Sequence, residues 1–314
     1  NRDVASPFLT SIQENAVKPI EPVFLDFKKD MSQLTAKSDI PVLYKQNTTN
    51  DLFQLIYVFD MGNNNDKALG TAFDYLEYLG TSDMTPEELK SEFYRLACTF
   101  YVSPGNERTY VVLSGLNENM PAAMQLFEKL LADAQVNKEA YNNLVGDILK
   151  ARADAKLNQG QNFSRLINYA MYGPKSPATN LLTEAELASM NPQELVDRIH
   201  NQNNYKQRIL YYGPSSSKDL LATIDQYHQV PATLKDIPAG NEFSYLETPA
   251  TKVLVAPYEA KQIYMAQISN LDKKYDPAIE PTRELYNEYF GGGMNSIVFQ
   301  EMRETRGLAY SAWA

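Results

Sequence analysis

The sequence predicts an α+β protein with two homologous domains, each an antiparallel sheet with helices packed on one face, the second domain being truncated. Two observations predict this class. Segments with the two-residue alternation of strands occur in blocks, separated by segments with helical periodicity, and this distribution is typical of α+β folds. The order of strands followed by a helix then begins again after residue 247.

The composition indicates a folded globular protein and excludes several functional classes. At 314 residues with 44% apolar content, the chain is long enough for two cores. A net charge of −10 argues against nucleic acid or an anionic membrane surface as partner. No apolar run approaches the ~20 residues that span a membrane. A single cysteine, Cys98, excludes an internal disulfide. It lies in an apolar run that reads as helical, so we expect a small buried hydrophobic side chain there.

The two ends suggest a piece of a longer protein. The chain begins NRDVASPFLT, without a methionine or a basic and then apolar leader, and it stops at Ala314 inside a predicted strand. The composition does not fix the compartment. Export to the periplasm is slightly favoured, and the cytoplasm stays open.

The predicted first domain covers residues 38–230 and follows a lead-in linker, 1–37, that holds one short helix or strand. Its clearest helix start is the segment 85–88, where Thr85 can cap the helix, Pro86 takes the first position and Glu88 the third. We expect this helix to run to about residue 99. Apolar side chains at helical spacing predict a helix over 66–79. The other predicted strands are 41–46, 52–62, 109–116 and 207–213, and the other predicted helices begin at 119, 137, 162, 192 and 218.

A segment rich in proline and polar residues, 231–247, is the predicted linker between the domains. The predicted second domain, 248–314, begins with two strand-like segments, TKVLVAPY at 251–258 and KQIYMAQIS at 261–269. Helices are expected at about 278–290 and 296–304. A turn at Arg306-Gly307 and a final strand complete the prediction.

Histidine gives no support for a metal site. The chain has two histidines, His200 and His228, which lie on different predicted elements. Neither has a second histidine four residues away, the spacing that places two imidazoles on one helix face. Both fall at predicted helix ends, where a cationic side chain is favourable, so we predict no metal ligands.

Arg303 and Tyr310 form the strongest candidate site. They are separated by seven positions, across a helix end, a glycine turn and the start of a predicted strand. A guanidinium offers a rigid fork of donors to carbonyl or carboxylate oxygens, and a phenol can stabilise a developing oxyanion. The alternative is structural, with the arginine paired to Glu301 or Glu304 and the tyrosine filling a core.

The string that holds this pair, GGGMNSIVFQEMRETRGLAYSAWA at 291–314, resembles the signature of the pitrilysin/insulinase (inverzincin) metallopeptidases and of the mitochondrial processing peptidases. In that family the string lies in the half of the molecule that holds substrate and carries no zinc. The resemblance implies that Arg303 and Tyr310 reach towards the zinc site of the other half. There they would bind the substrate main chain and stabilise the scissile carbonyl.

The resemblance also implies that the zinc motif is degenerate. Active members carry H-x-x-E-H on their first long helix. The matching segment is DYLEY, with Asp74 and Tyr78 in place of the histidines, and only Glu77 retained. The acidic ligand further along the chain would fall near Asp147. Carboxylates without imidazoles suit calcium or magnesium better than zinc, so we predict no metal, no cofactor and no catalytic residue in this chain alone.

The resemblance therefore implies the C-terminal, non-catalytic half of a long bacterial metalloendopeptidase that encloses peptides in a chamber. The segment PIEPVFLDFKK, at 19–29, looks like the lead-in to that half. The expected partners are a peptide substrate and an N-terminal catalytic half that supplies zinc. Two alternatives stay open: a separate subunit that pairs with a zinc-bearing chain, and a structural scaffold like the core proteins of respiratory complexes.

Overall fold

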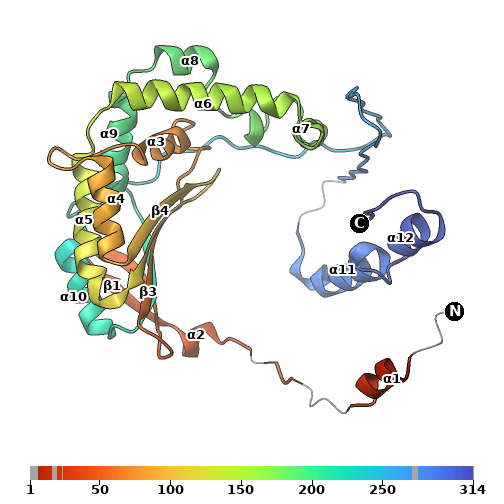
Figure 1. The fold of residues 1–314 in the computed structure, drawn as a ribbon, viewed down its shortest axis with the longest axis horizontal. Coiled ribbons are helices and arrows are strands. Elements are labelled where there is room, and N and C mark those ends of the chain that lie inside the picture. Colours follow the sequence, from red (N-terminus) through yellow and green to blue (C-terminus); the bar gives the residue numbers. More distant parts are fainter. Residues whose placement is uncertain (1–5, 16–19, 23, 271–274, 314) are drawn as a thin grey trace. The chain divides into compact units, whose positions relative to one another are not determined.

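The computed structural model describes residues 6–15, 20–22, 24–270 and 275–313 (Figure 1). The predicted lead-in, 1–37, lies partly outside these residues. The chain divides into two compact units. The first comprises residues 1–165 and 174–243, and the second comprises 166–173 and 244–314.

The first unit is built on a six-stranded sheet in the order β1-β2-β6-β3-β5-β4. Along β3, Phe53, Leu55 and Tyr57 are buried, whereas Gln54 between them is exposed. This alternation is the two-residue period that the sequence predicted for the segment. The strands are β1 Ser32–Ala36, β2 Ile40–Gln46, β3 Leu52–Phe59, β4 Cys98–Pro104, β5 Thr109–Leu116 and β6 Arg208–Gly213.

The sheet is mixed, and the expectation of a purely antiparallel sheet is wrong. β6 pairs antiparallel with β3 but parallel with β2. The reason is non-local: β6 follows a long helical crossover from β5 and inserts between β2 and β3, which run in opposite directions. A parallel neighbour needs such a crossover, and local sequence patterns do not report where it returns.

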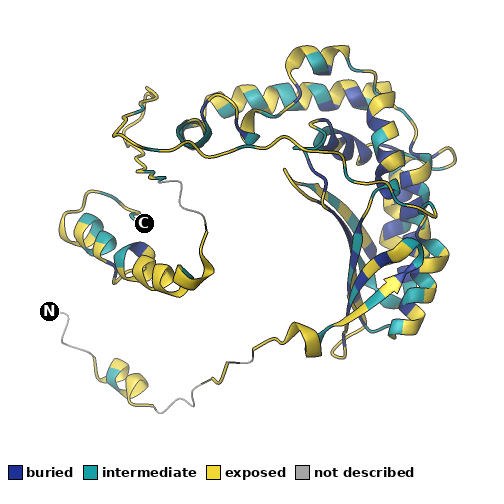
Figure 2. Ribbon diagram, turned by 180° about the vertical axis from the view of Figure 1, so that it is seen from behind, coloured by how far each residue is buried: buried dark blue, intermediate teal, exposed yellow. Residues whose placement is uncertain are grey.

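Helices cover one face of this sheet (Figure 1). Buried residues concentrate where these helices meet the strands (Figure 2). On that face α5 contributes Met124, Phe127 and Leu130 to the core. Within the described ranges, no helix is long and apolar enough to cross a membrane. The helices up to residue 227 are α1 Pro7–Gln13, α2 Phe27–Asp30, α3 Leu69–Leu76, α4 Pro86–Arg95, α5 Met120–Asp133, α6 Lys138–Lys156, α7 Gln159–Tyr172, α8 Glu184–Ser189, α9 Gln193–Asn201 and α10 Ser217–Tyr227.

The helix predicted from Thr85 forms with the expected capping box between Thr85 and Glu88, but it ends at Arg95. The expectation that it reaches residue 99 is wrong. Ala97 adopts a left-handed backbone conformation, with φ of 49°, and β4 starts at Cys98. Pairing along the whole of β5 outweighs the local helical pattern here. Cys98 is buried as predicted, and this burial raises the pKa of its thiol.

The second unit contains helices but, in its described residues, no strand. The helices predicted at 278–290 and 296–304 are present: α11 Glu280–Asn287 continues as a π-helical segment to Gly292, and α12 Ile297–Phe299 continues likewise to Thr305. The strands predicted at 251–258, at 261–269 and after Gly307 are not formed. In the part of the chain that the structure describes, neither of the first two segments has a neighbouring strand with which to exchange ladder hydrogen bonds, and side chains such as Val253 and Ile263 are exposed.

A buried ionisable cluster ties α5 to the end of α10. The Glu128 carboxylate, only 1% exposed, lies 2.6 Å from Nδ1 of His228. Its other oxygen accepts hydrogen bonds from the Asn203 side chain (2.9 Å) and the Gln229 backbone N–H (3.0 Å). The Tyr57 ring packs on His228 at 4.3 Å between centroids. His228 does lie at a helix end, as predicted, but it serves as a core partner of a carboxylate.

This cluster predicts a large stability loss for Glu128→Ala. Removing one member of a buried pair leaves the other without its partner, and such changes cost about 3–5 kcal/mol. We expect the free energy of unfolding, measured by urea titration with circular dichroism, to fall by that amount. Asp147→Ala removes an exposed carboxylate from α6 and serves as the control, with an expected change under about 0.5 kcal/mol. A loss under about 1 kcal/mol for Glu128→Ala contradicts the assignment.

Candidate functional site

The helix on which the sequence analysis expected the degenerate zinc motif is α3, and side chains outside it fix its start. Ala68 at its N-cap has no capping side chain of its own. Instead, the Asp66 carboxylate accepts the Ala68 backbone N–H (3.0 Å), and the Asn63 side chain accepts that of Gly70 (2.9 Å). Arg198 of α9 holds Asp66 at 2.7 Å. The helix start is thereby anchored to the neighbouring helix.

The degenerate motif positions lie on the exposed side of α3 and just beyond its end. Asp74, Glu77 and Tyr78 are exposed, whereas Phe73 and Leu76 face the core. Partial burial raises the pKa of the Asp74 carboxyl, and the negative charge of Glu77 raises it further. Two repelling carboxylates without an imidazole form a poor zinc site.

Asp147, the predicted remnant of the downstream ligand, is exposed on α6. The structure does not bring it together with Asp74 and Glu77 as a metal-binding group. Throughout the described ranges, no group of three or more histidine, cysteine, aspartate or glutamate side chains is arranged to hold a metal ion. The residues present at this helix therefore do not fit zinc.

Tyr75 has a structural role that the sequence did not reveal. Its hydroxyl donates to the backbone carbonyl of Asn137 (2.6 Å) and accepts the Asn137 backbone N–H (2.9 Å). Asn137 is the N-cap of α6, and the Tyr75 ring meets that of Tyr141 edge-on at 5.8 Å. The residue between the two lost histidine positions thus fastens α3 to α6. Its place in the degenerate motif gave no sign of this contact.

Arg303 and Tyr310 come together in the second unit. The Arg303 guanidinium carbon lies 5.1 Å from the centroid of the Tyr310 ring and 4.7 Å from that of Phe299. The turn that permits this uses Gly307, whose φ of +58° suits glycine, and the Gly307 N–H donates to the Arg303 carbonyl at 3.0 Å. Leu308 continues the turn with a hydrogen bond to the carbonyl of Met302.

The environment of this pair departs from the structural alternative raised by the sequence. Tyr310 is 86% exposed and fills no core. The contact between Arg303 and Glu304 is long, at 3.9 Å, and Glu301 lies closer to Arg306, at 3.5 Å. The Arg303 guanidinium thus lies against two aromatic rings in addition to its long contact with Glu304. Such stacking leaves hydrogen-bonding edges available for planar acceptors.

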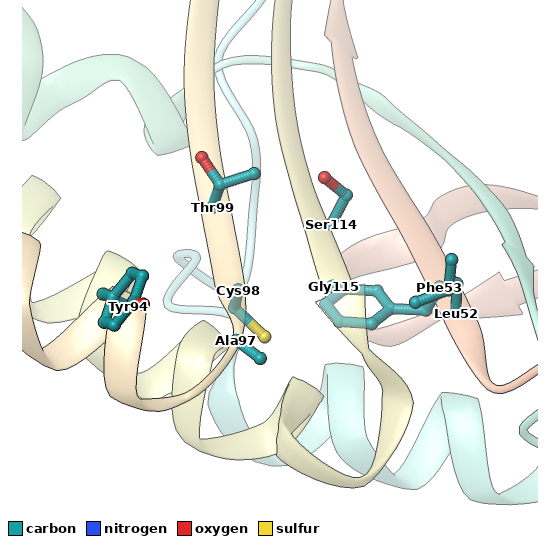
Figure 3. A pocket seen from close by; sticks show the side chains of 8 residues that line it. All are labelled: Leu52, Phe53, Tyr94, Ala97, Cys98, Thr99, Ser114 and Gly115. Atoms are coloured by element: carbon teal, nitrogen blue, oxygen red, sulfur yellow. The ribbon is translucent and has the colours of Figure 1, made fainter.

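A hollow of about 620 Å³ lies at one end of the sheet, beside the start of β4 (Figure 3). Apolar side chains dominate its wall, and Thr99 and Ser114 supply the hydroxyl groups. The wall contains no carboxylate or imidazole; its titratable groups are the Tyr94 phenol and the Cys98 thiol, whose pKa is raised by burial. Its lining residues are Leu52, Phe53, Tyr94, Ala97, Cys98, Thr99, Ser114 and Gly115.

Gly115 and Gly146 form a matched test of the packing at this hollow. A Cβ on Gly115 would lie 2.4 Å from the Ala97 carbonyl oxygen, and its φ of +152° disfavours other residues. We expect Gly115→Ala to lower the free energy of unfolding by roughly 1–3 kcal/mol. Gly146 is in α6 with open space around it, so Gly146→Ala should raise stability by roughly 0.5–1 kcal/mol. Urea unfolding of both variants measures these changes in the free energy of unfolding. Equal changes in the two variants would contradict the close packing at Gly115.

The chain is similar in sequence to curated zinc proteases. No family model matches the chain. A zinc protease of Rickettsia felis is 22% identical over 263 residues, which cover 79% of this chain and 60% of that protein. The zinc protease YmxG of Bacillus subtilis is 23% identical over 250 residues, covering 77% and 58%. The chain thus spans about three fifths of the length of these curated relatives.

Solved structures share the fold. The peptidase M16 inactive domain of Pseudomonas fluorescens matches with a TM-score of 0.66 at 17% identity, over 90% of this chain and 70% of that one. The chain is a relative of the M16 (pitrilysin-like) zinc proteases. The periplasmic protease PqqL of Escherichia coli also matches this M16 relative, with a TM-score of 0.61 at 14% identity, over 80% of this chain and 31% of that one.

Restoring histidines at positions 74 and 78 tests whether their absence is the reason that α3 does not fit zinc. The double variant Asp74→His/Tyr78→His restores the H-x-x-E-H spacing, with one imidazole on α3 and the other in the turn that follows it. We expect zinc affinity, measured by competition with a chelating dye, to rise at least tenfold over the natural chain. Asp74→Asn/Tyr78→Phe is the control and should gain none. Stoichiometric, chelator-resistant zinc in the natural chain contradicts our interpretation of the helix.

Proposed function

We propose that this chain is the non-catalytic, substrate-binding half of a zinc-dependent metalloendopeptidase that degrades peptides in a closed chamber. One observation carries the proposal. The fold is that of an M16 domain, yet α3 and the turn after it carry Asp74, Glu77 and Tyr78 where a zinc site needs imidazoles. Zinc and the general base belong, in this proposal, to a catalytic half or to a separate zinc-bearing chain.

Within that assembly Arg303 and Tyr310 are the substrate-binding residues. The guanidinium donates to main-chain carbonyl oxygens of the peptide, and the phenol donates to the scissile carbonyl as it gains negative charge. The geometry supports this role, because the two side chains lie together while Tyr310 stays exposed. The Phe299 ring helps to hold the guanidinium in place.

The domain organisation belongs to the same proposal. Residues 38–230, together with β1 from the end of the 1–37 lead-in, form the inactive peptidase-like domain. Residues 231–247 form the linker, and 248–314 begin a second, homologous α+β domain. The alternation of the 251–258 and 261–269 segments supports this, as do the exposed apolar side chains of Val253, Val255, Ile263 and Met265, which a completed sheet would bury.

The alternative is a structural scaffold related to the same family. Loss of the imidazoles from α3 is equally expected of a scaffold. The two functions differ at Arg303 and Tyr310, because a scaffold has no use for an exposed guanidinium and phenol aimed at a peptide. Catalysis by the assembled enzyme therefore separates them.

The test uses this chain with its zinc-bearing half and a fluorogenic peptide. Removing a positioned donor to a developing oxyanion costs about 10²–10³ in kcat. We expect Arg303→Ala and Tyr310→Phe each to lower kcat by that factor, while the chain alone cleaves nothing. Arg306→Ala, which removes a neighbouring exposed guanidinium, is the control with an expected change under about threefold. Unchanged cleavage by both site variants contradicts the substrate role and favours the scaffold.

A further inference from the structure

Among the described residues of the first unit, no helical layer covers one face of the sheet, which we call the open face. It is the face opposite α4, α5 and α10 (Figure 1). Strand register arranges its side chains in rows that run across the sheet. The central row is apolar: Tyr101 at its end is 51% exposed, Val112 beside it is buried, and the other three side chains are partly exposed. From one strand to the next this row consists of Leu43, Leu210, Ile56, Val112 and Tyr101.

The rows on either side of the apolar row are polar or charged, except for Val58, which is apolar and buried. Tyr212 and Tyr110, which are 45% and 37% exposed, add one phenol to each flank. The first flanking row contains Lys45, Tyr212, Gln54, Ser114 and Thr99, and the second contains Arg208, Val58, Tyr110 and Ser103.

The charge of the open face is opposite to that of the chain. The protein has 39 acidic and 29 basic residues, yet no aspartate or glutamate occupies a position in either flanking row or in the central row. The nearest carboxylate along β3 is Asp60, which Arg108 and Arg208 hold at 2.8 Å and 2.5 Å. The hydrogen bond from Arg208, followed by that from Arg108, lowers the pKa of Asp60 and keeps it ionised. Together with Lys45, the two arginines bring three positive charges to this face, against the single negative charge of Asp60.

We propose that the open face binds an extended segment of acidic polypeptide with an apolar side chain at its centre. The inference deepens the proposed function, since it rests on a peptide being the ligand and adds the class of peptide. The apolar row removes the central side chain from water, and the cations on the two flanks attract carboxylates. Although the chain as a whole is strongly acidic, this face is cationic, and its charge is therefore complementary to an acidic peptide.

The spacing of the rows specifies the pattern of the ligand. Arg208 and Tyr212 are four residues apart on β6, with Leu210 between them, and Tyr212 pairs with Lys45. At a rise of about 3.3 Å per residue, the two flanks are about 13 Å apart. An extended peptide that runs along the strands spans the same distance between its residues i and i+4. The preferred sequence is therefore acid-x-apolar-x-acid, because residues i, i+2 and i+4 point to the same side.

The test measures the binding of three fluorescein-labelled peptides to the full chain by anisotropy. The peptides are Gly-Asp-Ser-Phe-Ser-Asp-Gly and its analogues with asparagine or lysine in place of both aspartates. We expect the aspartate peptide to bind at least tenfold more tightly than the asparagine peptide, and the lysine peptide more weakly still. High salt should reduce the difference, since exposed charges are screened.

Matched variants locate the binding surface. Lys45→Glu and Tyr101→Ser, on the open face, should each weaken binding of the aspartate peptide at least fivefold. Lys218→Glu makes the same charge change at an exposed position of α10 in the helical layer and should leave binding unchanged. Circular dichroism of each variant checks that the fold is retained.

The outcomes separate this inference from the proposed function. Equal binding of the three peptides, or loss of binding in the Lys218→Glu variant but not in Lys45→Glu, overturns the inference and leaves the substrate-binding role of Arg303 and Tyr310 standing. A concentration-dependent dimer in light scattering, abolished by Lys45→Glu, also overturns it, because a second copy of the chain then covers the face. Cleavage that is insensitive to Arg303→Ala overturns the proposed function whatever the peptides do.

Discussion

The one-sided burial of the six-stranded sheet is the constraint on which the rest of the first unit depends. Tyr57 and Phe127 belong to a single core between strands and helices, and the register of β3 with β5 and β6 sends every second side chain away from that core. A shift of one residue in any strand would exchange the two faces. The arrangement that stabilises the fold therefore also fixes which side chains form the open face. Stability and surface chemistry are set by the same pairing.

Sequence patterns predicted the elements that local interactions determine. The boundaries of β5, at 109–116, agree with the structure, as does the capping box at Thr85. These patterns failed where strand formation or strand direction depends on partners that are distant in sequence. β4 forms because β5 lies beside it, although the residues before Cys98 read as helix, and the parallel pairing of β2 with β6 depends on a crossover of about ninety residues. The alternation at 251–258 was recognised, but alternation alone makes no strand without a partner.

At the candidate site, too, the sequence predicted features that depend on local residues and missed those that depend on residues distant in the chain. The resemblance to a family predicted Asp74, Glu77 and Tyr78 as degenerate motif positions, because the family's motif states where histidines would stand. Nothing local indicated that Glu128 is buried, since its donors come from His228, Gln229 and Asn203, far along the chain. The stacking of Arg303 on two rings was also hidden, because it depends on a left-handed glycine that follows the helix.

The two proposed peptide contacts differ in the free energy they affect. Arg303 and Tyr310 address main-chain oxygens, which every peptide has, and their strongest contact forms as the scissile carbonyl gains charge. The open face addresses side chains, whose contacts are the same before and during the reaction. Interactions made equally in both states lower KM without raising kcat, whereas those made only in the transition state raise kcat. Substitutions such as Lys45→Glu should therefore change KM for acidic peptides and leave kcat intact, while Tyr310→Phe should lower kcat for peptides of any sequence. A measured split of this kind assigns selectivity to the sheet and catalysis to the arginine–tyrosine pair.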